Sequence, residues 1–321
     1  MYSVVIPTYK RPKELQNCIR FIFNQTIKPK EVVVSGVIGD KTIEEVIPKL
    51  SKECESRGIS FKFIGSYRKG ISYQRNRGME AAQQKYILMI DDDVEIPPNF
   101  VETAISILNE KKALIVSGFD TRPPIVRKFQ NLWRRVFYLD YYAKNFQIVL
   151  PSGSKVIAYT ADREISTQWL STTVWVMRSE VAKKIKFDEN LVNYSHREDQ
   201  DYSYTVYKVF GGGLILSPRL KFVHHHSSAG RIRVSKFCHL YVYNTFLLFR
   251  KHFFNSPRNK AIFIWSMIGM AIQGLNHALQ QRNLGIFYET IVALARVVVN
   301  WSNAKHLCFK RLYEPVSDQN I

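Results

Sequence analysis

Short apolar runs alternate with amphipathic stretches along the first third of the chain. Continuous apolar runs are typical of strands buried on both faces of a sheet, and apolar residues spaced three and four apart are typical of helices. This alternation predicts a mostly parallel sheet with right-handed crossovers. The predicted strands are Tyr2–Ile6, Glu31–Ser35, Ser60–Ile64, Tyr86–Ile90 and Ala113–Ser117. The predicted helices are one from Pro12, then Thr42–Ser56, Gly70–Gln84 and Pro97–Lys111.

The pattern changes from Phe119 to Gln168, where no regular period is present and aromatic and basic residues are frequent. We expect an irregular insertion that either binds an acceptor through its aromatic faces or only covers the sheet edge. Regular structure then resumes. The predicted elements are a strand over Trp169–Met177, a helix that opens near Glu198 and stops at three glycines, and strands over Leu214–Ser217 and Lys221–His226.

Three long apolar stretches follow, which predict helices at Phe237–Phe249, Ala261–Gln281 and Leu284–Val299. The second is long enough to cross a bilayer, but its polar residues, such as Gln273 and His277, favour a position in the membrane interface. Basic residues flank these stretches, which suits anionic headgroups. The alternative is an ordinary helical cap. We therefore predict a catalytic domain over residues 1–230 and a membrane-associating helical region over 231–321.

The charge of the chain calls for an anionic partner. It has 46 Lys and Arg against 27 Asp and Glu, a formal net charge of +19, which fits nucleotide phosphates, nucleic acid or an anionic membrane. No nucleic-acid-binding motif is present. The four cysteines are far apart and predict neither a zinc site nor disulfides. With a predicted strand beginning at Tyr2, no signal peptide is expected, and we predict a cytoplasmic location.

Three carboxylates follow the fourth predicted strand directly, at Asp91, Asp92 and Asp93. Ligands of open α/β sheets bind at this edge. Adjacent carboxylates repel one another unless a cation lies among them, and oxygen ligands suit Mg²⁺ or Mn²⁺. We expect a divalent-metal site here. The alternative is a solvated acidic turn.

Two further motifs supply candidate chemistry. Three consecutive histidines end the last predicted strand, where His224 and His226 should point to one side and His225 to the other. A neutral imidazole among them could be a ligand of Mn²⁺. The alternative is that the three histidines form a solvated sheet edge. Glu198 and Asp199 open a predicted helix, where the helix dipole alone would favour carboxylates.

These motifs, in their order and spacing, resemble glycosyltransferase family 2 of the GT-A fold, including bacterial surface-polysaccharide sugar transferases. The resemblance spans roughly residues 2–228 and rests on five segments. They are Val4-Val-Ile-Pro-Thr-Tyr-Lys-Arg-Pro12, Arg75-Asn-Arg-Gly78, Ile87-Leu-Met-Ile-Asp-Asp-Asp93, Arg197-Glu-Asp-Gln-Asp201 and His224. It implies a Rossmann-like central sheet flanked by helices.

The resemblance also implies roles for individual residues. Asp199 would be the catalytic base, and a divalent cation, Mn²⁺ or Mg²⁺, would be held by Asp93, Asp91 and His224. The nucleotide sugar would contact Thr8, Tyr9, Arg11, Asp40, Arg75, Asp91 and Asp92. One departure concerns the nucleobase: family members carry Asp-Asp-Gly-Ser after the second strand, whereas this chain has Ser35-Gly36 and its nearest carboxylate is Asp40.

The function implied is metal-dependent, inverting transfer of a sugar from a nucleotide sugar to a glycan or lipid-linked glycan hydroxyl in cell-surface polysaccharide synthesis. The protein would lie on the inner face of the cell membrane, bind its anionic surface and not bind nucleic acid. Two alternatives remain. One is a sugar nucleotidyltransferase, although no Gly-rich phosphate loop follows the first strand. The other is an inactive, basic membrane-binding module on the same fold.

Overall fold

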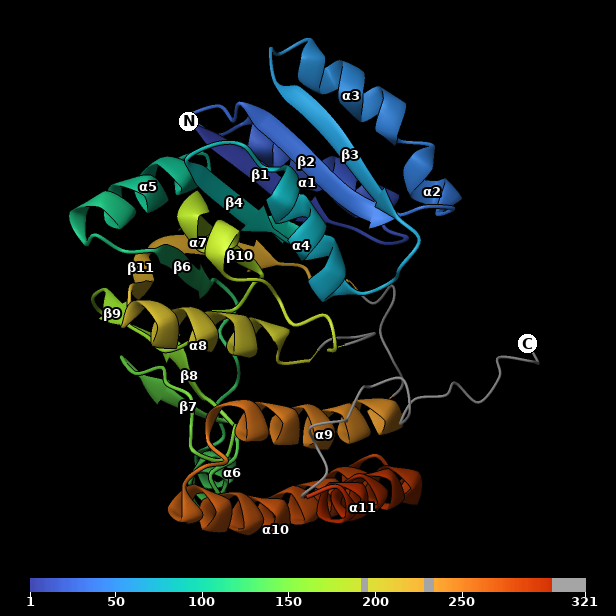
Figure 1. Cartoon of the computed structure of the whole chain (residues 1–321), viewed down its shortest axis with the longest axis vertical. Coiled ribbons are helices and arrows are strands. Elements are labelled where there is room, and N and C mark those ends of the chain that lie inside the picture. The colour runs from blue at the N-terminus through green and yellow to red at the C-terminus, as the bar shows by residue number, and fades with distance from the viewer. Residues whose placement is uncertain (192–195, 228–233, 302–321) are drawn as a thin grey trace.

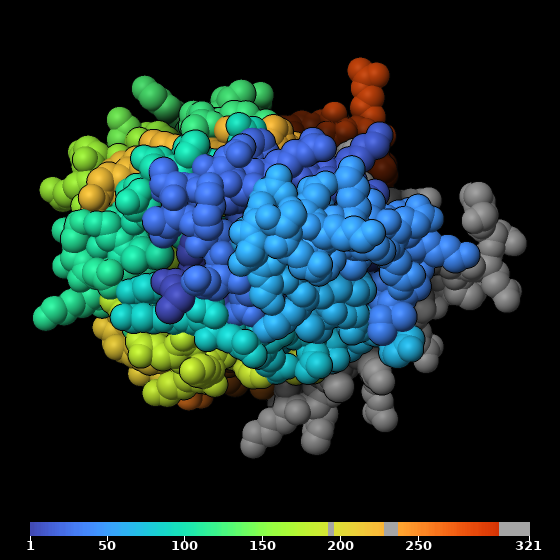
Figure 2. Space-filling model, turned by 90° about the horizontal axis from the view of Figure 1, so that it is seen from above, coloured from blue at the N-terminus to red at the C-terminus, as the bar shows by residue number. Residues whose placement is uncertain are grey.

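The computed structural model describes residues 1–191, 196–227 and 234–301 (Figure 1). The boundary predicted between residues 230 and 231, and the tail from residue 302, lie outside these ranges. A mixed sheet with helices on both faces occupies one end of the molecule, and three long helices occupy the other (Figure 1). Seen from the end opposite those helices, the surface is formed mainly by the N-terminal part of the chain (Figure 2).

The central sheet has the strand order β3-β2-β1-β4-β10-β6-β11-β5, and β9 pairs with β11. Its strands are β1 (Tyr2–Pro7), β2 (Glu31–Val37), β3 (Ser60–Ser66), β4 (Tyr86–Ile90), β5 (Val94–Glu95), β6 (Ile115–Asp120), β9 (Ile165–Ser166), β10 (Val174–Arg178) and β11 (Leu214–His224). As predicted, β1 to β4 are mutually parallel. The strand β10 lies between β4 and β6 and runs antiparallel to both, so the sheet is mixed.

Successive residues of the central strands belong to two different hydrophobic cores, which explains their unbroken apolar character. Val4 and Ile6 face one core and Val5 faces the other, because side chains alternate across a sheet. The first core is closed by α1 (Pro12–Phe23), α3 (Ile47–Glu55) and α5 (Phe100–Glu110). The second is closed by α4 (Ile71–Ala81), α7 (Ser179–Lys184) and α8 (Glu198–Phe210).

The helix predicted at Thr42–Ser56 is wrong in one respect, because the structure divides it into α2 (Lys41–Glu44) and α3. Pro48 lies in the first turn of α3. Proline has no N–H to donate to the preceding turn, so it is placed best where a helix begins.

The prediction of an irregular segment from Phe119 to Gln168 is also wrong. It contains α6 (Lys128–Val136), the strand β9, and a separate parallel pair, β7 (Tyr141–Lys144) and β8 (Val156–Thr160). Three apolar residues of α6, Phe129, Leu132 and Val136, are exposed, and Trp133 is only partly buried. A helix is recognised from sequence by apolar residues that face a core. Because these three residues of α6 do not, its sequence gave no sign of a helix.

The C-terminal helices α9 (Val234–His252), α10 (Pro257–Gln280) and α11 (Leu284–Val299) form a third core of their own. Leu139, which follows α6, belongs to the same core. The approach is close, since a Cβ at Gly269 of α10 would lie 2.4 Å from the Cβ of Phe137. The helical layer is thus packed against the 119–168 segment.

Candidate active site

A cavity of about 490 Å³ opens at the carboxyl ends of β1 and β4 and extends to the first turn of α8. Of the residues to which the resemblance assigned a role, all except Asp40 line it. Those that line it are Thr8, Tyr9, Arg11, Arg75, Asp91, Asp92, Asp93, Asp199 and His224. The parallel strands end at the same edge and bring Thr8 and His224, 216 positions apart in the sequence, into the same cavity lining.

The three consecutive aspartates have three different sets of partners. Asp91 lies 2.9 Å from an Arg75 nitrogen, and a second Arg75 nitrogen lies 2.8 Å from Glu198. Burial would lower the pKa of the Arg75 guanidinium, but the two carboxylates more than offset this and raise it. Burial also raises the pKa of Glu198 to about 7. Arg75 therefore joins the end of β4 to the start of α8, and its contact with a donor stays a prediction.

Asp92 is held by the loop after β1. Its carboxylate accepts a hydrogen bond of 2.8 Å from the Thr8 hydroxyl and lies 3.1 Å from Arg11. Burial raises the pKa of Asp92 to about 7, although Arg11 and Thr8 oppose that shift. The loop after β1, which is predicted to contact the nucleotide, is thus bound through Thr8 and Arg11 to the turn that contains Asp92.

Asp93 faces the end of β11. One of its oxygens lies 3.1 Å from His224 Nε2, and the other accepts a hydrogen bond of 2.9 Å from the Ser227 backbone N–H. Burial would raise the pKa of Asp93, but the hydrogen bond and charge of His224, the Ser227 N–H and Arg11 outweigh it and lower the pKa to about 2. Asp93 is therefore the carboxylate of the three that is most strongly held as an anion.

The three histidines point as their alternation predicts. His224 and His226 lie together, with ring centroids 4.0 Å apart, whereas His225 points away to Glu95. Asp120, at the end of β6, lies 3.8 Å from His226. Ligand atoms of Asp120, His224 and His226 all lie within 4.8 Å of one another. The sequence argument missed Asp120, although a carboxylate at the end of a parallel strand could have indicated it.

These side chains fit a divalent cation. Carboxylate oxygens and neutral imidazole nitrogens are ligands that Mn²⁺ accepts, and His224 is shared between Asp93 on one side and the Asp120 group on the other. Asp91, the other predicted ligand, is bound to Arg75.

Asp199 lies in the first turn of α8 and lines the same cavity. One of its oxygens accepts a hydrogen bond of 2.7 Å from the Gln200 N–H, and the other lies 3.7 Å from Lys155 Nζ. Lys155 also lies over the ring of Trp169, 4.0 Å from its centroid. No sequence signal indicated Lys155, because it comes from the segment without a regular period.

Asp40 lies outside the residues that line the cavity. It accepts hydrogen bonds of 2.7 Å from the Lys10 backbone N–H and from the Thr42 hydroxyl. It therefore supports the loop before Arg11. At the end of β2 the cavity is lined by Val37, an apolar residue, so its wall there carries no carboxylate.

The family model described as Glycosyl transferase family 2 matches residues 3–185. The chain belongs to this family. Among curated relatives, a GalNAc(5)-diNAcBac-PP-undecaprenol beta-1,3-glucosyltransferase from Campylobacter jejuni is 28% identical over 108 residues, which are 34% of each chain. A chondroitin synthase from Escherichia coli is 33% identical over 111 residues, 33% of this chain and 15% of that one. The chain thus matches about a third or less of the length of these two relatives.

Solved structures share the fold at low identity. A mannosyltransferase from Pyrobaculum calidifontis, in complex with GDP-Man and Mn²⁺, superposes with a TM-score of 0.55 at 14% identity, over 98% of this chain and 81% of that one. GalNAc-T7 with UDP, GalNAc and Mn²⁺ gives a TM-score of 0.56 at 13% identity, over 81% and 51%. The fold is GT-A, as the sequence predicted.

Proposed function

We propose that this protein is a metal-dependent, inverting glycosyltransferase that moves a sugar from a nucleotide-diphosphate sugar to a hydroxyl of a glycan or lipid-linked glycan. The observation that carries the proposal is one cavity lined by Asp93, His224 and Asp199 together. The solved relatives with Mn²⁺ and GDP-Man or UDP support the donor class and the cation.

The donor would lie along the edge formed by the loop after β1 and the acidic turn. Thr8 and Arg11 are already bonded to Asp92, so this wall is fixed before a ligand enters. Tyr9 lines the same wall and offers an aromatic face to a base. A fixed wall reduces the ordering cost of binding.

A divalent cation would be held by Asp93 and His224, with Asp91 or Asp120 next to them. When bound, it would neutralise charge on the diphosphate leaving group. On the protein side, Arg11 lies 3.1 Å from Asp92 and 3.4 Å from Asp93, and it would interact with the same phosphates.

Asp199 would accept the proton of the acceptor hydroxyl. Attack from the face opposite the diphosphate would invert the anomeric carbon, and a positioned general base is typically worth about 10²–10⁴ in rate. Lys155, 3.7 Å from Asp199, would orient that carboxylate. The proton leaves the hydroxyl as its oxygen bonds to the sugar, and the nucleoside diphosphate departs.

The protein would bind the anionic inner face of the cell membrane through α6 and α10. Apolar side chains of both helices are exposed: on α6 Phe129, Leu132 and Val136, and on α10 Ile264, Ile268, Ile272, Leu275 and Leu279. The Trp265 indole N–H donates to the Val136 carbonyl at 2.9 Å, so the two helices lie side by side (Figure 1).

The charges around these two helices support the same contact. Residues 121–139 carry five Lys or Arg and no Asp or Glu, and Arg258 and Lys260 lie in the first turn of α10. Apolar residues with basic neighbours are typical of helices in the membrane interface. Among the described residues, α10 alone is long and apolar enough to cross a bilayer, with 33% of its apolar window buried. Its packing against α9 and α11 favours the interfacial position.

The acceptor would be a glycan or lipid-linked glycan of cell-surface polysaccharide synthesis. The names of the relatives from Campylobacter jejuni and Escherichia coli, a GalNAc(5)-diNAcBac-PP-undecaprenol beta-1,3-glucosyltransferase and a chondroitin synthase, support this class. Calorimetric titration of UDP and GDP with Mn²⁺ and with EDTA tests the donor half. We expect one of them to bind with Mn²⁺ and to lose most of its affinity in EDTA, and binding of neither would contradict the proposal.

A further inference from the structure

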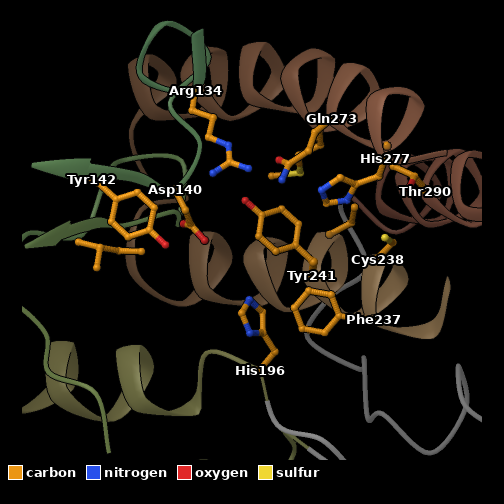
Figure 3. Close-up of a pocket in the computed structure, with 14 residues that line it drawn as sticks. Arg134, Asp140, Tyr142, His196, Phe237, Cys238, Tyr241, Gln273, His277 and Thr290 are labelled. Carbon is orange, nitrogen blue, oxygen red and sulfur yellow. The ribbon is translucent and has the colours of Figure 1, made fainter. Parts of the chain in front are cut away.

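A second cavity, of about 220 Å³, lies between the 119–168 segment and the C-terminal helices (Figure 3). It is adjacent to the first cavity, because His196 lines both. Arg197, next along the chain, lines the first cavity and bonds to Asp140, which lines the second. No role assigned so far uses this space.

A cation without a counter-charge faces this cavity. Among the described residues, the Arg134 guanidinium forms no ion pair, and its buried Nε has no hydrogen-bond partner. The carboxylate that lines the cavity, Asp140, lies 3.0 Å and 3.2 Å from Arg197 and also accepts from the Lys155 N–H. Asp140 is therefore paired with Arg197 and does not neutralise Arg134. A half-buried charge without a partner is costly to maintain.

Other polar groups around the cavity also lack partners. Gln273 Oε1 and His196 Nε2 are buried and make no hydrogen bond within the described chain. The polar ends of Arg134, Gln273 and Tyr241 point into the same space (Figure 3). Burial lowers the pKa of His196 and of His277, so both imidazoles are neutral near pH 7. The unpaired charge in the cavity is thus positive and comes from Arg134.

The walls between these polar groups are apolar and come from Phe237, Val242 and Met270. Arg134 is carried by α6, on the side away from the exposed Phe129 and Leu132. A helix that lies in a membrane interface with that apolar side down holds Arg134 near the depth of lipid phosphates. An anionic group attached to an apolar chain therefore matches both the charge and the walls.

We propose that this cavity binds the phosphate group of a prenyl-phosphate-linked acceptor, with Arg134 as its counter-cation and Gln273 and Tyr241 as further polar contacts. The inference rests on the proposed glycosyltransferase function and identifies the acceptor class. His196 and Arg197 lie between this phosphate and Asp199, so the lipid phosphate is held on the acceptor side of the cavity that contains the base.

The test is a titration with farnesyl phosphate, farnesol and inorganic phosphate, below the micelle concentration and without nucleotide sugar. The variants are Arg134→Gln and, as the control, Arg135→Gln, which makes the same charge change one residue along α6 at an exposed position outside the cavity. Farnesyl phosphate should bind the wild type and Arg135→Gln equally. Arg134→Gln should weaken it by about ten- to a hundredfold, as expected for loss of a charged hydrogen bond.

Four outcomes would overturn the proposal: unchanged binding in Arg134→Gln, an equal loss in Arg135→Gln, farnesol binding as tightly as farnesyl phosphate, or inorganic phosphate binding as tightly as farnesyl phosphate. Thermal unfolding checks that Arg134→Gln is folded. Should it not fold, Gln273→Leu replaces it and should weaken farnesyl phosphate about fivefold. Because no donor is present, failure here is distinct from failure of nucleotide binding or donor hydrolysis.

Discussion

His224 Nε2 lies 3.1 Å from Asp93 Oδ1 and so joins the end of β11 to the turn after β4. The two residues are 131 positions apart in the sequence, and only the pairing of β11 with β6 and of β10 with β4 and β6 brings them together. This contact places a carboxylate and an imidazole next to each other in the lining of the cavity that Asp199 also lines.

Asp93→Asn should abolish the metal-dependent part of nucleotide binding. The amide keeps the size of the side chain but removes the negative charge that a cation needs. We expect nucleoside diphosphate affinity in Mn²⁺ to fall to the value measured in EDTA. Asp162→Asn, which removes an exposed carboxylate that does not line the cavity, serves as the control and should leave both values unchanged. Equal affinity with and without Mn²⁺ in the wild type would refute the role of Asp93.

Asp199→Asn should reduce transfer by about 10²–10⁴, the usual value of a positioned general base. Nucleotide binding should stay within about twofold of the wild type, because the donor-side contacts of Thr8 and Arg11 are untouched. Single-turnover transfer and calorimetry with the same preparation separate the two effects. An Asn variant with near-full transfer would mean that another group accepts the proton.

Leu132→Ser on α6 should weaken binding to phosphatidylglycerol vesicles by about tenfold. The side chain is 61% exposed in the protein alone, and burying a leucine in an apolar environment is worth about 1.5–3 kcal/mol. Val209→Ser on α8, where the side chain is 46% exposed, is the matched control and should have no effect. Vesicle flotation at two salt concentrations measures both. Identical flotation of the two variants would exclude α6 from the contact.

The stability of the fold should depend on pH through Glu31. This buried carboxylate accepts from Ser3, Lys62 and the Gln83 N–H. Burial would raise the pKa of Glu31, but these partners outweigh it and lower the pKa below its ordinary value of 4.5. A lowered folded-state pKa stabilises the protein above the unfolded-state pKa, and this stabilisation is lost as pH falls through the folded-state value.

Glu31→Gln should therefore lower the melting temperature at pH 7, and the difference from the wild type should shrink below about pH 4.5. Melting curves from pH 7 to pH 3 measure this. Glu102→Gln, at the exposed bond to Thr26, is the control. A difference in melting temperature that stayed constant down to pH 3 would show that the negative charge of Glu31 does not contribute to stability.

Much of the fold could be predicted because local pattern and tertiary structure agree in the first half of the chain. The runs Val4–Ile6 and Tyr86–Ile90 are buried on both faces, so their apolar character is continuous and their ends mark the cavity edge. The antiparallel direction of β10 could not be predicted, because strand direction depends on a long connection whose path no local pattern encodes.

The candidate site likewise contains residues that could be predicted from the sequence and residues that could not. Asp93 follows a predicted strand, Asp199 opens a predicted helix and His224 lies near the end of a predicted strand, and the structure places all three around one cavity. Lys155 and Arg134 could not be identified, since they come from a segment whose helix turns its apolar side outward. The helix α6 departs from the usual inward pattern of soluble proteins, and that departure itself supports a membrane partner.

Hydrolysis of a panel of nucleotide sugars in Mn²⁺, Mg²⁺ and EDTA tests the central claim most directly, because it asks whether this cavity activates a donor. We predict slow release of one nucleoside diphosphate with Mn²⁺ or Mg²⁺, none in EDTA, and none from Asp93→Asn. Release that is independent of metal, or no release of any nucleoside diphosphate together with no nucleotide binding, would contradict the account.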